Sequence, residues 1–472
     1  MEHPPARRYA GCATRARRNP LTDTPAEFIP PFPPRHPEKL PAWKLFMRAR
    51  RNMLTLFSER SFAARHIRAR MLRREFHLFN TPAAIHSVMV AQNDAFERKT
   101  PQMRHALEPL VGDGLIISDG LVWKERRRVV QAVTRPARMP ALTPVMTGVA
   151  EETLAAWRTL PEGHRLDVME EMGRFAAQTV TRAAFGLALG RDSAARVVAA
   201  FAAYQARIGN LDFASLLGLP DVLPRLNALL RWREVREIHG VVEGLIADVL
   251  DHGRGEDSLI AAMAEAPGMT REGFRNEALT LFLAGHETTA NVMSWCWYLL
   301  SQAPWAEARL REEASAVLGG RAAGFDDLAR LPYTRAVVEE TLRLYPPIPI
   351  LAREAQQDTE VEGIAVRRGS MVMVSPWVMH RHRAHWEAPD AFRPERFLPG
   401  APPPVRHSYL PFSLGPRVCT GVQFGLYEAM ICLASLAQHI RLRAEPGHVV
   451  MPVSRLTLRP GTSLPMRIAH LR

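Results

Sequence analysis

The sequence is poor in cysteine and has no long apolar run, and both absences exclude classes of protein. Four cysteines occur in 472 residues, and no two have the C-x-x-C spacing of zinc sites or thioredoxin-like redox sites. A long chain with few cysteines is typical of proteins from a reducing compartment. We therefore expect a cytoplasmic protein. The longest apolar run, 290–300, contains Asn291 and Ser294 and falls well short of the roughly 18 residues that a transmembrane helix needs.

The amino-terminal region also lacks the apolar core of a secretory signal. It is instead rich in Pro and Arg over residues 1–42, with the sequence I-P-P-F-P-P at 29–34. We expect an extended, polyproline-like segment that is partly disordered, above all over residues 1–20. The absence of both a signal sequence and a transmembrane run predicts a soluble protein.

Acidic residues are outnumbered by basic ones. The chain has 61 Lys and Arg against 48 Asp and Glu, a net charge of +13. A basic balance admits a nucleic acid, an anionic membrane surface or an acidic protein as partner. No zinc-finger spacing and no aromatic RNA-binding stretch is present, so we rank nucleic acid last and expect none to bind.

Helical periodicity dominates the sequence from about residue 80 onward. Asn80-Thr81-Pro82 has the composition of a helix start, and Thr270 caps a helix that is predicted to run to Gln302. Further helices are expected over 123–132, 144–160, 167–188, 192–208 and 228–252. Short strands are expected around 350–354, 359–366 and 371–376, with a β hairpin over 451–470. The fold class is therefore mainly α with a small β lobe.

The most informative stretch runs from Phe412 to Gly421 and reads F-S-L-G-P-R-V-C-T-G. Gly415 and Gly421 permit close approach of backbone to a large flat ligand, and Arg417 supplies a cation suited to a carboxylate. An apolar helical pattern follows Cys419, and a helix N-terminus favours a thiolate over a thiol. A thiolate so placed can be the axial ligand of haem iron, whereas a lone cysteine without such surroundings is more often an inert buried residue.

The pattern F-x-x-G-x-R-x-C-x-G resembles the haem-binding loop of the cytochrome P-450 monooxygenases, and further motifs match in the family's order over roughly residues 105–460. The resemblance implies haem b (iron protoporphyrin IX) as cofactor, with Cys419 as the iron ligand and Phe412 and Gly421 in the haem-binding loop. Gly425 departs from the family's usual alanine, which we do not expect to affect ligation.

The resemblance also bears on domain organisation. Length alone would suggest about three domains, but the motifs must converge on one cofactor. We therefore expect a single haem-thiolate monooxygenase domain over 43–472, with the cytochrome P-450 fold and a long central helix that crosses the domain over the haem. The lack of a membrane anchor resembles the soluble bacterial members.

The predicted long helix contains A-G-H-E-T-T at 284–289. A glycine inside a helix costs about 1 kcal/mol relative to alanine, and such breaks of local preference are expected at functional sites. The stretch resembles the family's oxygen-activating motif. Ala284 and Gly285 would make room for O2, Thr288 would donate a hydrogen bond to the oxygen being activated, and Glu287 would help to deliver protons. A close helix–helix contact through Ala284 and Gly285 is the alternative, and His286 is expected to be a packed or rim residue and not an iron ligand.

Two charged motifs lie between these segments. Glu340 and Arg343 are spaced i, i+3 in a predicted helix and share a face, which on its own is also typical of a solvated surface pair. The segment P-E-R-F at 394–397 resembles the family's partner motif. The resemblance implies that Arg396 joins Glu340 and Arg343 in a buried network that holds the cysteine loop.

A further set of residues would bind the haem propionates by the same resemblance. Trp123 and Arg127 are spaced i, i+4 on a predicted helix and would point at a propionate, as would Arg417. His105 and Arg353 are further candidates for this role. The alternative for the segment around Trp123 is a plain amphipathic basic helix.

The implied activity is O2-dependent hydroxylation of a hydrophobic small molecule. Apolar residues in several segments would line the pocket, although core packing explains them equally well: 92–120, 201–225, 348–351 and 453–457, together with Leu281, Phe282 and Ala284. The chain has no Gly-rich dinucleotide fingerprint, so electrons would come from a separate ferredoxin or flavoprotein. Two alternatives stay open, a peroxide-driven or rearranging haem-thiolate enzyme and a non-catalytic haem-binding sensor.

The electron donor is expected on the cysteine side of the haem. Cations on that side would attract an acidic donor protein: Lys124, Arg126, Arg128 and Arg406. The alternative is that these residues form only a solvated basic face.

Overall fold

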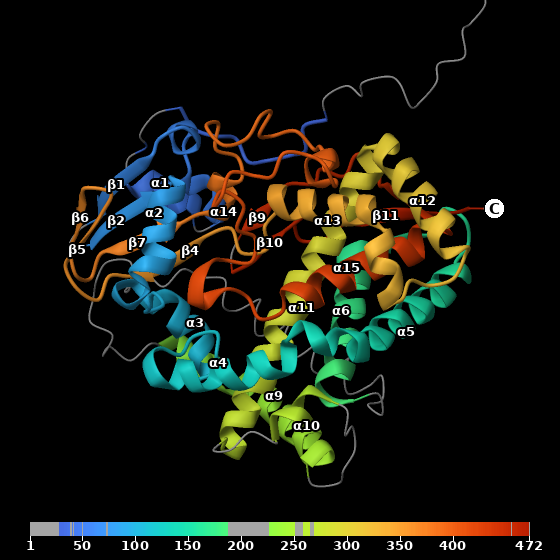
Figure 1. Cartoon of the computed structure of the whole chain (residues 1–472), viewed down its shortest axis with the longest axis horizontal. Helices are drawn as coiled ribbons and strands as arrows, with labels where there is room; N and C mark the ends of the chain where they lie inside the picture. The colour runs from blue at the N-terminus through green and yellow to red at the C-terminus, as the bar shows by residue number, and fades with distance from the viewer. Residues whose placement is uncertain are drawn as a thin grey trace, which may run out of the picture.

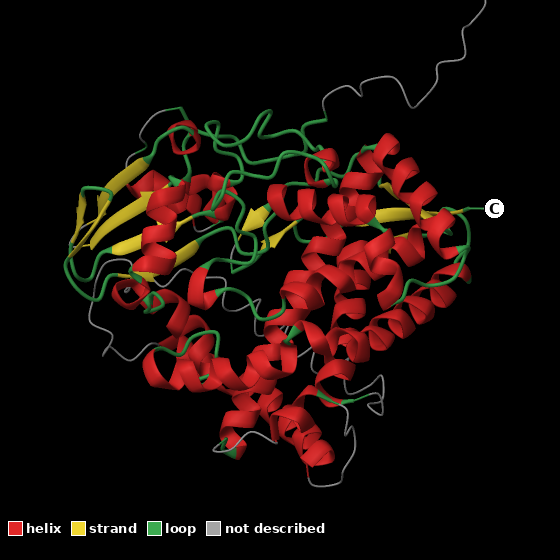
Figure 2. Ribbon diagram, in the orientation of Figure 1, coloured by secondary structure: helices red, strands yellow, loops and turns green. Residues whose placement is uncertain are grey.

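The computed structural model describes residues 28–37, 40, 42–49, 51–71, 74–186, 226–250, 258–264, 269–454 and 456–471. Helices make up most of the body, and the sheet of β1 (His66–Met71), β2 (Arg74–Phe79), β7 (Met371–Val374) and β4 (Leu351–Glu354) lies toward the left of the view in Figure 1. Figure 2 shows the same separation of a large helical part from a smaller strand-rich part. The fold class predicted from the sequence is confirmed. The expected helix at 192–208, the pocket segment 201–225 and the residues 1–20 lie outside the described residues.

Helix α11 (Arg271–Gln302) crosses the middle of the helical body (Figure 1). It begins after Thr270, whose side chain accepts a hydrogen bond from the Gly273 N–H, and ends before Pro304 as predicted. Its 32 residues give a length of about 48 Å. It packs along α6 (Val168–Phe185) more extensively than along any other described element.

The remaining helices surround this axis and have the following bounds: α1 (Ala42–Ala49), α2 (Pro82–His86), α3 (Pro101–Val111), α4 (Gly120–Thr134), α5 (Met139–Arg158), α9 (Leu226–Leu250), α10 (Leu259–Ala264), α12 (Pro304–Leu318), α13 (Pro332–Leu344), α14 (Pro376–Met379) and α15 (Val422–Ala437). The helix expected from residue 144 begins earlier, at Met139, because Pro140 occupies the first turn, where proline is tolerated. The helix expected over 167–188 ends at Phe185, before Gly186, whose φ is +99°.

Two sheets contain strands from distant parts of the chain. The first has the order β1 (His66–Met71), β2 (Arg74–Phe79), β7 (Met371–Val374) and β4 (Leu351–Glu354), with β2 and β7 parallel and the other neighbours antiparallel. The second has β11 (Pro465–His470) between β3 (Arg165–Asp167) and β8 (Ile440–Ala444).

Two strand expectations were wrong in detail. The segment 359–366 is not one strand but a hairpin of β5 (Thr359–Val361) and β6 (Ile364–Val366), since Glu362 and Gly363 turn the chain with φ of +49° and +77°. The segment 451–470 is not one hairpin. A short hairpin pairs β9 (Val453–Ser454) with β10 (Leu458–Arg459), whereas β11 joins the other sheet.

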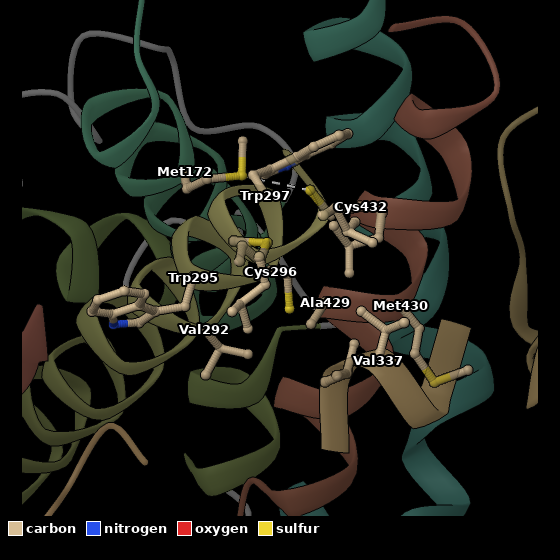
Figure 3. Close-up of a cluster of buried hydrophobic side chains, with 14 of the residues drawn as sticks. Met172, Val292, Trp295, Cys296, Trp297, Val337, Ala429, Met430 and Cys432 are labelled. Atoms are coloured by element: carbon tan, nitrogen blue, oxygen red, sulfur yellow. Dashed lines mark hydrogen bonds between the residues drawn. The ribbon is translucent and has the colours of Figure 1, made fainter. Parts of the chain in front are cut away.

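The largest hydrophobic core joins α11, α13 and α15 and includes two of the cysteines. Figure 3 shows Cys296 and Cys432 among Met172, Trp295 and Trp297 in this core. The Cys432 Sγ atom lies 3.7 Å from the Met172 Sδ atom. None of the helices within the described ranges has the length and hydropathy needed to cross a membrane.

Candidate active site

The three cysteines that the structure describes differ in accessibility. Cys296 and Cys432 are fully buried, and burial raises the pKa of the Cys296 thiol to about 12 and moves that of Cys432 in the same direction. Cys419 is exposed. It is therefore the cysteine, among the described residues, whose sulfur an external ligand can reach.

The loop around Cys419 holds the sulfur by backbone geometry. The Cys419 N–H donates to the Phe412 carbonyl at 2.9 Å, and the Gly421 N–H donates to the Cys419 Sγ at 3.3 Å. Gly415 has φ of +72°, and a Cβ atom there would lie 2.1 Å from the Met89 carbonyl oxygen. The close approach that we expected at Gly415 is thus made by the protein itself, and no other residue type fits that position.

The thiol of Cys419 is accessible although protein surrounds it densely. Burial raises the pKa of this thiol, and the Gly421 N–H and the charge of Arg127 oppose the rise only in part. The Cys419 sulfur is thus accessible at a place where the surrounding protein desolvates it. The helix-terminus effect that we expected is outweighed by burial, so a bound metal ion is what would hold this residue as a thiolate.

A cluster of cations lies beside the cysteine loop. Arg353 is buried, and burial followed by the charge of Arg417 lowers its pKa to about 10. Lys99 pairs with Arg353 through a backbone bridge, and burial together with the charges of Arg353 and Arg417 lowers the pKa of Lys99. Lys99 was missed by sequence reasoning, because nothing local to residue 99 indicates that it meets residue 353.

Two carboxylates partly balance this cluster. The Arg417 Nη2 atom lies 3.0 Å from Glu97 and 3.4 Å from Asp119, and Asp119 is also paired with Arg104 at 2.8 Å. The cluster thus has three cations, Lys99, Arg353 and Arg417, but only two carboxylates, Glu97 and Asp119. Asp119 is in addition paired with Arg104. This uncompensated positive charge, in a desolvated place, fits a ligand with carboxylates of its own, as haem has.

Helix α4 supplies the other side of the cluster. The Arg417 guanidinium lies over the buried Trp123 ring, 4.1 Å from its centroid, and the Arg127 Nη1 atom donates to the Val418 carbonyl at 2.6 Å. Both residues therefore meet the cysteine loop, and their part in binding a haem propionate stays a prediction. His105 lies on α3 and is partly buried, and its part in binding a propionate stays a prediction.

The A-G-H-E-T-T motif places its members in different surroundings. Ala284 is exposed in the middle of the central helix, and the Thr288 hydroxyl donates to the Ala284 carbonyl at 2.5 Å. A Cβ atom on Gly285 would lie 2.9 Å from Val180 Cγ2 of α6. Gly285 thus takes part in the close helix–helix contact that the sequence left as an alternative, whereas Ala284 and Thr288 have open surface.

The two remaining members of the motif face other residues. His286 stacks on Phe282 with centroids 5.3 Å apart, and burial lowers its pKa to about 4, which agrees with a packed histidine. Glu287 is buried and accepts hydrogen bonds from Thr457 and Arg459, two residues that the sequence did not connect with it.

The expected charge network is present and buried. Arg343 and Glu340 are both inaccessible, with Arg343 Nε 2.7 Å from Glu340 Oε2, so the surface-pair alternative is wrong. Arg396 Nε lies 3.5 Å from Glu340 Oε1. The Arg343 side chain also donates to the backbone carbonyls of His380, Pro389 and Ala391, which ties the segment before the cysteine loop to α13.

His380 extends this network toward the cysteine loop and was also missed. Its Nδ1 atom bonds the Arg343 carbonyl at 3.0 Å, and its Nε2 atom accepts from the Leu410 N–H at 2.9 Å. These two partners require the neutral ring with its proton on Nδ1. Burial is the main cause that lowers the pKa of His380 to about 3, in agreement with that tautomer.

Comparison with known proteins decides which family has this arrangement. The family model described as cytochrome P-450 matches residues 30–464. The chain belongs to the cytochrome P-450 family. It is 35% identical over 373 residues to cyclooctatin synthase of Streptomyces melanosporofaciens, covering 76% of this chain and 79% of that one. It is 30% identical over 370 residues to pentalenene oxygenase of Streptomyces avermitilis, covering 76% and 80%.

Membership of the cytochrome P-450 family confirms several predictions at once. The cofactor is haem b, held in this family through a cysteine thiolate, and the enzyme is an oxygenase. The match also extends upstream of residue 105, where the motifs began, to residue 30. It thus includes part of the N-terminal segment, where Tyr345 donates a hydrogen bond to the Pro31 carbonyl at 2.8 Å.

Proposed function

We propose that Cys419 is the haem-iron ligand of this cytochrome P-450 and that the enzyme hydroxylates a hydrophobic small molecule with electrons from a separate protein. The observation that carries the proposal is the state of Cys419. Among the described cysteines it is the accessible one, its loop is fixed by backbone hydrogen bonds, and uncompensated cations lie close to it.

The protein groups around the cofactor have separate tasks. The bound haem supplies the oxidation chemistry, in which one atom of O2 enters a C–H bond and the other leaves as water. Cys419 would hold the iron through its sulfur. Arg417, Arg353 and Lys99 neutralise the carboxylates of the cofactor, and Trp123 fixes the Arg417 guanidinium by stacking. Arg127 holds the backbone of the loop.

Proton delivery falls to the central helix. The Thr288 hydroxyl now donates to the Ala284 carbonyl, and a change of its side-chain rotamer turns the same proton toward the open surface beside Ala284. Glu287 is the acid next to it along the chain and replaces the proton that Thr288 gives up. Proton transfer by such positioned groups contributes about 10²- to 10⁴-fold to rate.

The electron donor is a separate ferredoxin or flavoprotein with an acidic surface. Lys124 and Arg128 on α4 and Arg406 before the cysteine loop are exposed, and Leu121 and Val122 of α4 expose 76% and 42% of their surface beside them. An apolar patch rimmed by cations suits an acidic protein with an apolar centre. We expected Arg126 to be one of the cations that attract the donor. Its side chain is instead only 14% exposed and is paired with Asp113 at 3.0 Å.

The substrate is a hydrophobic small molecule. Partly exposed apolar side chains lie in several segments expected to line the pocket: Met103, Leu115, Ile116, Leu281, Ile350 and Leu456. One relative is named for the oxygenation of pentalenene, so pentalenene belongs in the first substrate panel beside fatty acids and aromatic compounds. A ligand that binds near the iron changes the haem spectrum, and this change is the readout for the panel.

A spectrum tests the iron ligand. Carbon monoxide added to the reduced protein is expected to give the red-shifted Soret band of thiolate-ligated haem, and Cys419→Ser is expected to abolish that band. Cys296→Ala and Cys432→Ala are the matched controls and retain it. A band that survives in Cys419→Ser would overturn the assignment.

A turnover assay then separates the reaction types. NADH consumption with surrogate ferredoxin and flavodoxin donors, coupled to oxygenated product, supports the donor-dependent monooxygenase. Product with hydrogen peroxide alone and none with donors indicates a peroxide-driven enzyme, and product without any oxidant a rearranging one. A thiolate spectrum without product from any substrate in the panel would indicate a sensor.

A further inference from the structure

The loop between α3 and α4, residues 112–119, lies directly against the first half of the central helix α11. A Cβ atom on Gly112 would lie 2.4 Å from the amide nitrogen of Asn276, and a Cβ atom on Gly114 would lie 2.2 Å from the Thr280 hydroxyl oxygen. Any larger residue at either position would require the neighbouring side chain to move. The two glycines thus let the backbone of the loop follow the surface of α11 closely.

A buried carboxylate of α11, that of Glu277, binds this loop. The Leu115 N–H donates to Glu277 Oε1 at 2.9 Å, and the Arg126 Nε atom of α4 lies 3.7 Å from the same oxygen, on a side chain of Glu277 that is 0% exposed. Arg126 Nη2 donates to both carboxylate oxygens of Asp113 at 3.0 Å, and Asn276 donates to Asp113 at 2.8 Å. The loop, α4 and α11 therefore meet in one charged cluster.

The other end of the loop is held by the cations beside the cysteine loop. The Ser118 carbonyl accepts a hydrogen bond from Arg417 Nη1 at 2.8 Å, and Asp119 lies 3.4 Å from Arg417 Nη2. Between the two ends, Leu115 and Ile116 are apolar and partly exposed, and they belong to a segment that we expect to line the substrate pocket. The contact with α11 thus fixes one end of the segment that presents these two side chains.

At neutral pH the Glu277 carboxylate lies between its charged and neutral forms. Burial raises its pKa to about 7, the charge of Arg126 and the Leu115 N–H oppose the rise, and the charge of Asp113 adds to it. Helix α10 (Leu259–Ala264) carries no charged residue. Other charged groups of the elements packed on this part of α11 have partners of their own: Arg104 with Glu108 and Asp119, Arg275 with Glu243 and Glu272, Arg182 with Glu152, and His239, which bonds the Leu110 carbonyl and whose pKa is lowered by burial.

We propose that Glu277, together with Arg126, is a positioning residue for the substrate pocket, because its charge decides how firmly the loop 112–119 is held against α11; the proposal rests on the proposed function. Ionised Glu277 attracts Arg126 and accepts a charge-assisted hydrogen bond from the Leu115 N–H, which is roughly twice as strong as a neutral one. Protonated Glu277 loses the attraction to Arg126 and keeps only the weaker bond. A wall that is already held in place loses less freedom when a ligand binds, so the pocket binds more tightly with Glu277 ionised.

Hydrogen exchange in the holoenzyme tests the contact between the loop and α11. After correction for the intrinsic dependence of exchange on pH, the protection of the Leu115 amide is expected to be about fivefold higher at pH 8 than at pH 6. In Glu277→Gln the side-chain oxygen still accepts the hydrogen bond but does not titrate, so protection should be the same at both pH values. Glu272→Gln is the control and should behave as the wild type, because it removes an exposed carboxylate of the same helix, paired with Arg275.

Two further variants test the electrostatic cause, because they should move the midpoint of this pH dependence in opposite directions. Asp113→Asn removes the negative charge that raises the pKa of Glu277, so the midpoint should fall below that of the wild type. Arg126→Gln removes the cation that lowers the pKa, so the midpoint should rise. A purely structural role would change protection without moving the midpoint. Protection that does not depend on pH in the wild type, or a midpoint that neither variant moves, would overturn the proposal.

The link to the pocket is tested with n-butyl isocyanide, which binds haem iron, carries an apolar tail and does not titrate near neutral pH. Its affinity, read from the Soret band, is expected to be about fivefold lower at pH 6 than at pH 8 in the wild type and equal at both pH values in Glu277→Gln. An affinity in the wild type that is the same at both pH values would overturn the proposal. A wild type without the thiolate spectrum would instead remove the proposed function on which it rests, whereas the exchange of the Leu115 amide could still be measured.

Discussion

The guanidinium of Arg417 lies over the ring of Trp123, with its Cζ atom 4.1 Å from the ring centroid. The same side chain donates to the Ser118 carbonyl at 2.8 Å and to Glu97 at 3.0 Å. The cysteine loop and α4 are thus joined through one oriented cation. Because a planar guanidinium can stack and bond in several directions at once, an ammonium does not replace it.

Replacement of Arg417 by lysine is therefore expected to weaken haem retention. Loss of a desolvated cation–π contact amounts to about 2 kcal/mol, so the rate of haem transfer to an apo-globin acceptor should rise by roughly 30-fold. Trp123→Phe keeps an aromatic face and is the milder companion variant. Equal haem transfer from the wild type and Arg417→Lys would show that the stacked geometry does not matter for the cofactor.

The Glu340–Arg343 pair predicts a large effect on stability. Both side chains are inaccessible, so Glu340→Gln leaves the Arg343 charge buried without its carboxylate. Breaking a buried pair in this way costs about 3–5 kcal/mol, which denaturant unfolding of the holoenzyme measures.

The same helix offers a control for that prediction. Arg335 pairs with Glu339 at 3.4 Å with 55% of its side chain exposed, and its replacement by alanine should change the free energy of unfolding by less than about 1 kcal/mol. Similar losses for Glu340→Gln and Arg335→Ala would mean that the network does not hold the fold.

His380 makes the stability depend on pH. Its pKa is lowered to about 3 in the folded protein, against about 6.5 in an unfolded chain. Below the unfolded value the unfolded state binds more protons, so the free energy of unfolding falls as pH falls through this window, at up to about 1.4 kcal/mol per pH unit. Chemical denaturation between pH 7 and pH 5 should show this loss.

A histidine variant separates this contribution from the rest. His380→Gln removes the titrating ring and should give a shallower dependence on pH, although it is less stable at pH 7. His164→Gln, at an exposed position, should leave the slope as it is. If the slope of His380→Gln equals that of the wild type, the neutral ring of His380 is not the source of the acid sensitivity.

How much could be predicted from the sequence depends on how local each signal is. Helix α11 was predicted from the Thr270 cap and the proline after its end, both of which lie in the element itself. Strand β1 (His66–Met71) was missed, because it reads H-I-R-A-R-M at a mostly exposed sheet edge and has no apolar alternation. The start of α5 was predicted too late, at residue 144, because proline usually interrupts a helix, whereas Pro140 lies in the first turn, where it is tolerated.

In the site, too, the residues predicted from the sequence are those with a local signal. The sequence predicted Cys419 and Arg417 because they lie two residues apart in one loop. It did not predict Lys99 beside Arg353 or Arg459 beside Glu287, a pair separated by 172 residues. Side chains joined only by tertiary folding have no spacing rule that a single sequence could reveal.

Thr288→Ala should separate NADH consumption from product formation. The hydroxyl of Thr288 is the proton donor in our proposal, and methyl cannot replace it, so reduced oxygen should escape as hydrogen peroxide while haem binding stays intact. The measurement is product and peroxide per NADH. Thr288→Ser keeps the hydroxyl and should stay coupled. An unchanged product yield in Thr288→Ala would contradict the proton-delivery role.

The donor face gives the last prediction, in which two neighbouring arginines of α4 should behave differently. Arg128 is exposed, so Arg128→Glu should slow the first electron transfer at limiting donor and leave substrate binding unchanged. Rim charges act mainly on association rate and are screened over about 8–10 Å at moderate salt. The wild-type rate should therefore fall steeply with added salt, and the rate of Arg128→Glu should depend on salt less.

Arg126 serves as the contrasting variant. It is paired with Asp113 at 3.0 Å and lies 3.7 Å from the buried Glu277, so Arg126→Glu should lower the melting temperature, because two carboxylates lose their cation and gain a like charge. Arg128→Glu should melt as the wild type does. If neither added salt nor Arg128→Glu changes the electron-transfer rate, the donor docks elsewhere or chiefly through apolar contacts such as Leu121.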